Sequence, residues 1–210
     1  MDFVSARSNM VESQVRTSDV TGLELQHAMR NVARERFCAP ARAFAAYAEA
    51  DVEIAPGRAL MKPRDIGKLL QFAAPKAGEK ALAIAAPYAA AVMADMGLEV
   101  TAQEGDARAS AVVEQGLREH GVTLVTQDLT RPAGEGGYDL IVCEAACAEA
   151  PQAWLEALKP GGRLAMVLRD GPVGKARLFL AGEGFASSRE LFDSTPAMLA
   201  GFERAPTFQF

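Results

Sequence analysis

The stretch ALAIAAPYAAAVMADM, residues 81–96, indicates a short apolar strand (81–86), a turn and a helix (88–96). The same pattern recurs further along the chain, with apolar runs at 98–102, 122–125, 140–143 and 163–168 and with helices at 107–120 and 151–158. Alternating strands and helices of this length are closed by right-handed crossovers onto a parallel sheet that is covered on both faces. The predicted fold class is therefore α/β, with a doubly wound and mostly parallel sheet.

Both ends of the chain depart from this alternation. Towards the C-terminus, strands without a long helix are expected at 175–180, 189–192 and 202–210, which is typical of an antiparallel hairpin that completes a sheet. Towards the N-terminus, apolar positions at helical spacing predict two short helices within 9–36 and a third that begins at Pro63. We therefore expect a helical N-terminal extension, residues 1–75, packed on a main domain of residues 76–210.

The composition limits the classes of partner. The 210 residues include 22 basic and 27 acidic side chains, which gives a net charge of -5. Nucleic acid and anionic membranes each require a basic face, so neither is an expected partner. The sequence shows no membrane-spanning apolar run and no cationic leader, and Cys38, Cys143 and Cys147 are too few for a disulfide framework. We expect a cytoplasmic protein without a metal site.

Candidate ligand-binding residues follow the first strands of the main domain. In an open parallel sheet, ligands bind beyond the carboxyl ends of the strands, where the strand order reverses. Glu104 and Asp128 follow the second and third strands, where an adenosyl cofactor would meet one acid at its ribose and another near its adenine. Each carboxylate is equally consistent with a solvated loop residue.

The turn after residues 81–86 contains no glycine. Ala85, Ala86 and Pro87 stand where a nucleotide-binding turn normally lets the ligand approach the backbone closely. Alanine resists positive φ by roughly 1 to 2 kcal/mol, and its Cβ occupies space that a ligand would need. Proline removes an N–H but suits the first turn of a helix. The alternative interpretation is a packed strand-to-helix corner that holds no ligand.

Six further segments carry a resemblance to a known family. They are NMVESQVRTSDV (9–20), RERF (34–37), GRALMKP (57–63), YDLIV (138–142), LKPGGRL (158–164) and GFERAPTFQF (201–210). Together they resemble the bacterial branch of the protein-L-isoaspartate O-methyltransferase family, over nearly the whole chain. The resemblance implies a Rossmann-like class I methyltransferase domain over 76–210. It also implies S-adenosylmethionine as the methyl donor and isoaspartyl carboxylates of damaged proteins or peptides as substrates.

The resemblance also implies which residues form the site. The cofactor would be bound by Ala85, Tyr88, Glu104 and Asp128, and the substrate would lie near Arg58, Met61 and Lys62. Two positions depart from the family. The turn before Tyr88 lacks the family's glycines and is two residues short, and Met61 stands where the family places a serine or threonine. A thioether offers no O–H donor.

Three hypotheses follow from these departures. The first is an enzyme, an isoaspartyl methyltransferase or a relative with a shifted substrate that uses S-adenosylmethionine in an unusual pocket. We expect its activity to be weak or lost, which makes the chain a possible pseudoenzyme. The second is a non-catalytic family member that binds a protein or another small molecule. The third is a site for a different adenine-containing ligand held by Glu104 and Asp128. The sequence identifies no catalytic residue and predicts no oligomeric state.

Overall fold

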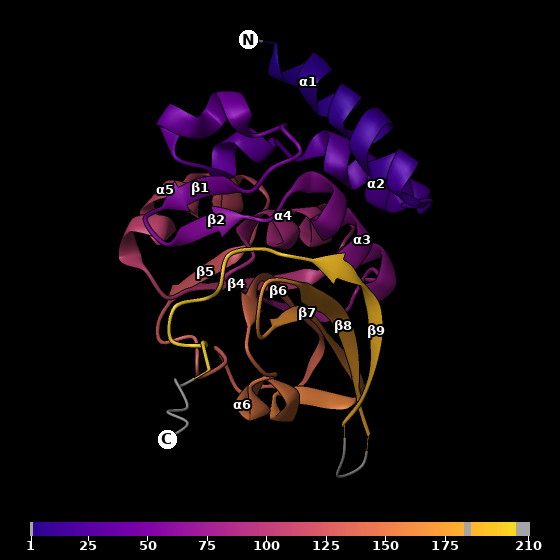
Figure 1. Ribbon diagram of the computed structural model, residues 1–210, viewed down its shortest axis with the longest axis vertical. Coiled ribbons are helices and arrows are strands. Elements are labelled where there is room, and N and C mark those ends of the chain that lie inside the picture. Colours follow the sequence, from indigo (N-terminus) through magenta and orange to yellow (C-terminus); the bar gives the residue numbers. More distant parts are fainter. Residues whose placement is uncertain (1, 183–185, 205–210) are drawn as a thin grey trace.

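A computed structural model describes residues 2–182 and 186–204 (Figure 1). Its centre is a seven-stranded sheet of order β5-β4-β3-β6-β7-β8-β9. The parallel strands are β3 (Lys80–Ile84), β4 (Glu99–Glu104), β5 (Thr123–Thr126), β6 (Tyr138–Cys147) and β7 (Leu158–Arg169). The antiparallel strands are β8 (Gly174–Ala181) and β9 (Ala186–Ser194). This arrangement confirms the predicted α/β class and the antiparallel C-terminal hairpin.

The two faces of the sheet are covered unequally. On one face, apolar side chains of β3 and β6 pack in one core with α3 (Pro63–Ala73), α4 (Pro87–Asp95) and α5 (Ala107–Glu119). On the other face, a smaller core centres on Trp154 of the short helix α6 (Gln152–Glu156). The indole Nε1 of Trp154 donates to the carbonyl of Leu129 at 2.8 Å, which ties α6 to the loop after β5.

The N-terminal part contains more structure than the sequence predicts. It has α1 (Phe3–Met10), a π-turn (Val11–Val15), α2 (Leu23–Asn31) and 3-10 turns at Arg16–Ser18, Arg34–Phe37 and Pro40–Ala45. Helical structure thus begins before the expected residue 9. Side chains of α2 share one core with α4, so packing marks no boundary between an extension and a main domain. The division of the chain at residue 75 stays a prediction.

Two differences from the expected elements concern strands. The hairpin of β1 (Val52–Ala55) and β2 (Arg58–Leu60) was not anticipated within a helical extension. Its two-residue turn is Pro56-Gly57, and Gly57 has φ +80°, a conformation that favours glycine. A strand was expected at 202–210, but residues 202–204 are irregular, and residues 205–210 lie outside the described residues.

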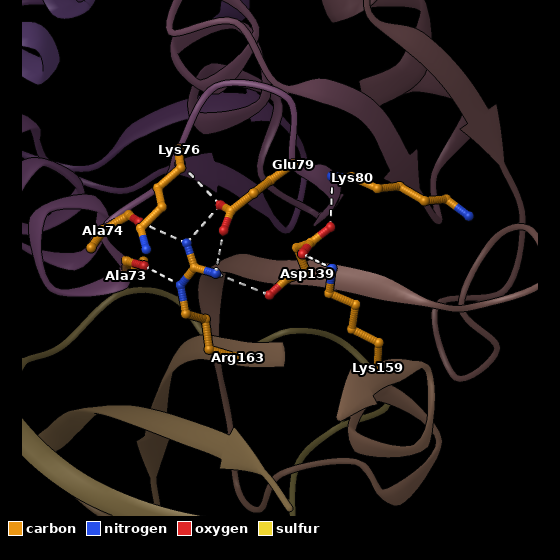
Figure 2. Close-up of polar contacts among 8 residues, drawn as sticks. All are labelled: Ala73, Ala74, Lys76, Glu79, Lys80, Asp139, Lys159 and Arg163. Carbon is orange, nitrogen blue, oxygen red and sulfur yellow. Dashed lines mark hydrogen bonds and ion pairs between the residues drawn. The ribbon is translucent and has the colours of Figure 1, made fainter. Parts of the chain in front are cut away.

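A cluster of hydrogen bonds and ion pairs connects the end of α3 to the amino ends of the strands (Figure 2). Arg163 of β7 donates to the carbonyls of Ala73 and Ala74 at the end of α3, and its Nη2 lies 2.7 Å from an oxygen of Glu79. Ala74 closes the helix with φ +48°. A cation near the last carbonyls of a helix is favourable. The arginine of the LKPGGRL segment therefore has a structural role at the sheet edge opposite the candidate site.

Candidate functional site

The turn between β3 and α4 is strained and tightly packed. Ala85 has φ +50°, in the left-handed region that costs a non-glycine residue roughly 1 to 2 kcal/mol. Its N–H donates to the carbonyl of Gln103 at 2.8 Å, which fixes the turn against β4. The side chains of Ala85 and Ala86 are 0% and 1% exposed, so both methyl groups are enclosed by protein. The strain that the missing glycine implies is thus located at Ala85.

The N-terminus of α4 already has a carboxyl partner from the chain itself. The N–H of Ala89 donates to Glu144 Oε1 at 2.6 Å, while Glu144 Oε2 has no hydrogen-bond partner among the described residues. Glu144 is buried in β6. Burial raises its pKa to about 7, although Arg34 and the Ala89 N–H act in the opposite direction. The first free amides of a helix are where an anion would bind, and here a carboxylate of the chain lies there.

Tyr88 faces the N-terminal part and is fully buried. The guanidinium carbon of Arg34 lies 4.6 Å from the centre of its ring, and Phe37 packs edge-on at 6.0 Å. The Tyr88 hydroxyl and Arg34 Nη1 have no hydrogen-bond partner among the described residues. Burial raises the pKa of Tyr88 well above its usual range.

Arg34 links Tyr88 to the predicted substrate segment. Its Nη2 donates to the carbonyl of Met61 at 2.5 Å, and the Met61 side chain is 1% exposed. The Lys62 ammonium lies 3.5 Å from a carboxylate oxygen of Asp65. The structure therefore places Tyr88 and Met61 around one buried arginine.

Arg58 and Glu104 form a buried, bidentate ion pair. Arg58 donates from Nε to Glu104 Oε2 at 3.1 Å and from Nη2 to Glu104 Oε1 at 2.8 Å. Its Nη2 also donates to the carbonyl of Ala85 at 2.9 Å. Burial acts to lower the pKa of Arg58, but Glu104 and other acidic neighbours raise it by more, so the guanidinium stays charged. Three of the predicted site residues are thus in direct contact.

A pocket of about 390 Å³ opens beside this pair. Its lining includes Gly57, Arg58, Gly105, Asp128, Thr130 and Phe202. Asp128 is exposed and accepts hydrogen bonds from the N–H and the hydroxyl of Thr130 at 2.9 and 2.8 Å. These bonds lower its pKa. Asp128 therefore lies at the same pocket as Arg58, at the carboxyl ends of the strands.

Two functional candidates escaped the sequence analysis. Arg34 lies within the RERF segment, but nothing in its spacing indicates contact with Tyr88 and Met61. Glu144 did carry a signal, since a carboxylate in the middle of the apolar strand YDLIVCEAAC is costly to bury without a partner. The resemblance implies a place for Arg58 near the substrate, and the structure pairs its guanidinium with Glu104.

Other kinds of site are not evident in the described part of the chain. Within residues 2–182 and 186–204, no group of three or more His, Cys, Asp or Glu side chains is arranged to hold a metal ion. The three cysteines are unpaired and buried. The helices of the described residues include none that is long and apolar enough to cross a membrane.

Comparisons with known proteins agree on one family. The model of the protein-L-isoaspartate(D-aspartate) O-methyltransferase (PCMT) family matches residues 5–179. A protein-L-isoaspartate O-methyltransferase of Methylorubrum extorquens is 33% identical over 178 residues, covering 82% of this chain and 77% of the relative. A relative from Rhodopseudomonas palustris is 33% identical over 174 residues, covering 79% and 76%. The beta-aspartate methyltransferase (PCMT) structure from Plasmodium falciparum, in complex with S-adenosyl-L-homocysteine, has a TM-score of 0.79 and 16% identity, covering 92% of this chain and 97% of that one.

Proposed function

The chain belongs to the protein-L-isoaspartate(D-aspartate) O-methyltransferase family, and from that premise we propose that it keeps the family fold while its S-adenosylmethionine-dependent methyl transfer is weak or lost. The observation that carries this proposal is the enclosed turn after β3. The methyl groups of Ala85 and Ala86 fill the space in which a glycine turn would admit a ligand to the backbone. The methionyl part of the donor could bind at this place only if the turn moved.

Glu144 adds an electrostatic obstacle at the same place. S-adenosylmethionine carries a carboxylate, and the Ala89 N–H at the start of α4 is already bound to the Glu144 carboxylate. A second carboxylate there would compete with Glu144 for the Ala89 N–H. Above about pH 7, where Glu144 is ionised, it would also meet a like charge in a buried setting, where repulsion is only weakly screened. The residues present therefore do not fit the methionyl half of the donor in this conformation.

The predicted acceptor side supports the same conclusion. Methyl transfer to a carboxylate needs no strong base, so positioning supplies much of the rate. Met61 brings no hydroxyl, its side chain is buried, and Arg58 is paired with Glu104 rather than left free for a substrate carboxylate. We propose damaged proteins with isoaspartyl residues as substrates of whatever activity remains.

Donor binding is the direct test. Calorimetric titration with S-adenosylmethionine and S-adenosylhomocysteine should give no heat of binding up to millimolar ligand, while the Methylorubrum extorquens relative, run as the control, should bind both. Transfer of labelled methyl groups to an isoaspartyl peptide should be at least about tenfold slower than for that relative, because the positive φ of Ala85 alone costs roughly 1 to 2 kcal/mol. Micromolar binding together with turnover at the relative's rate would overturn the proposal.

The pocket beside Arg58 favours a second candidate function, a non-catalytic binding module. A volume of about 390 Å³ lies within the usual range for small-molecule sites. The proposed location is the cytoplasm, because the three buried thiols are unpaired as expected in a reducing compartment. The acidic net charge of -5 supports protein or small-molecule partners over nucleic acid or membranes.

A further inference from the structure

Arg58, the first residue of β2, contacts both the turn after β3 and the end of β4. The Pro56-Gly57 turn ends the hairpin, and Arg58 is the first residue after it, paired in register with Ala55. From there its guanidinium contacts the end of β4 at Glu104 and the Ala85 carbonyl after β3. Because the side chain is 8% exposed and Glu104 is 1% exposed, this contact belongs to the interior of the protein.

Glu104 has the position of a ribose-binding acid. It ends the second strand of the first βαβ unit, 19 residues after Ala85, and in folds of this type an acid about 20 residues beyond the turn accepts hydrogen bonds from ribose hydroxyls. Two neighbouring hydroxyls present two O–H donors to one carboxylate. The Nε and Nη2 groups of Arg58 present two N–H donors to the same two oxygens, at 3.1 and 2.8 Å.

We infer that Arg58 is a built-in substitute for the ribose diol, and that it determines specificity by excluding adenine nucleosides from a pocket that otherwise suits them. This inference rests on the proposed function, since it assumes that Glu104 is the acid of the ancestral cofactor site. The adjacent pocket of about 390 Å³ leaves room for a base between Gly57, Gly105 and Asp128. A nucleoside must displace a charged, bidentate partner from Glu104 before its ribose can bind there.

The test is adenosine binding to the wild type and to Arg58→Ala, measured by calorimetry and by the shift in Tm. Adenosine lacks the methionyl arm, so Ala85 and Glu144 do not obstruct it. We expect no binding by the wild type up to millimolar adenosine, and an affinity at least about tenfold higher for Arg58→Ala, whose Glu104 is free to accept the hydroxyls. The double variant Arg58→Ala/Glu104→Gln should lose that gain.

Lys175→Ala is the matched control. Lys175 of β8 is not among the residues that line this pocket, and its side chain is 46% exposed and pairs with Asp193, so removing it takes away a positive charge without freeing Glu104. It should leave adenosine binding unchanged. If Arg58→Ala does not fold, Arg58→Lys keeps a charge beside Glu104 but cannot make the bidentate contact, and a smaller gain is expected.

Each outcome decides the inference. A higher adenosine affinity of Arg58→Ala that depends on Glu104 supports the inference. Three results overturn the inference. The wild type binds adenosine as tightly as the variant, or a folded Arg58→Ala or Arg58→Lys protein has no higher adenosine affinity than the wild type, or the higher affinity survives Glu104→Gln. The proposed function fails if the wild type binds S-adenosylhomocysteine and transfers methyl groups. That result is measured separately from adenosine binding, so the two failures can be told apart.

Discussion

Glu144 should make the free energy of unfolding decrease as the pH rises from about 4.5 to about 7. Its pKa in the folded protein is raised to about 7 by burial, from an ordinary value of 4.5. Between these two values the folded state holds a proton that the unfolded state has released. Stability is therefore fully present below about pH 4.5 and is lost as the pH rises through about 7.

The size of this effect follows from the two pKa values. They differ by about 2.5, and each unit corresponds to about 1.4 kcal/mol, so the full loss is about 3 kcal/mol. That is a large fraction of a typical folding free energy. The charged groups that act on Glu144 are Arg34 and Arg58, which favour its ionised form, and Glu104, which opposes it.

Urea unfolding between pH 4.5 and 8 measures the effect when the wild type is compared with Glu144→Gln. The glutamine resembles the protonated acid and does not titrate, so subtracting the two curves removes the other ionisable groups. The variant should become more stable relative to the wild type by about 3 kcal/mol across this range. Glu149→Gln, at an exposed glutamate nearby, should show no such change. Parallel curves for wild type and Glu144→Gln would refute the reasoning.

Three further predictions concern the stability of the fold and are measured by chemical denaturation. Arg163→Met should cost about 3 kcal/mol, because it leaves the partly buried Ala73 carbonyl and Glu79 carboxylate unpaired, whereas Lys159→Met, which breaks a more exposed ion pair, should cost less than about 1 kcal/mol. Equal losses would contradict the role assigned to the arginine. Ala74→Gly should gain about 1 kcal/mol by relieving a positive φ, while Ala48→Gly, where φ is not positive, should gain nothing. Trp154→Phe should cost about 2 kcal/mol through the lost indole hydrogen bond, and a neutral result would show that the bond adds nothing.

Much of the fold was predictable because its signals are local. The alternation of short apolar runs and helices predicts a parallel sheet, and β3, β4, β6 and β7 lie where that pattern indicates. Pro63 and the apolar positions that follow it predict α3 correctly. The β1–β2 hairpin is not predicted from the sequence because its strands have only four and three residues. Strands this short gain their stability from packing rather than from their own pattern.

An α/β sheet and a strand-to-helix turn without glycine depend on residues close together along the chain, so both are predictable from the amino-acid sequence. The groups that fill the site come from distant segments, so their contacts appear only in the folded protein. Arg58 and Glu104 are 46 residues apart, and Ala89 and Glu144 are 55 apart. No periodicity connects such residues. The fold places the β1–β2 hairpin against the end of β4 and the start of α4 beside β6, where a buried charge must find a partner.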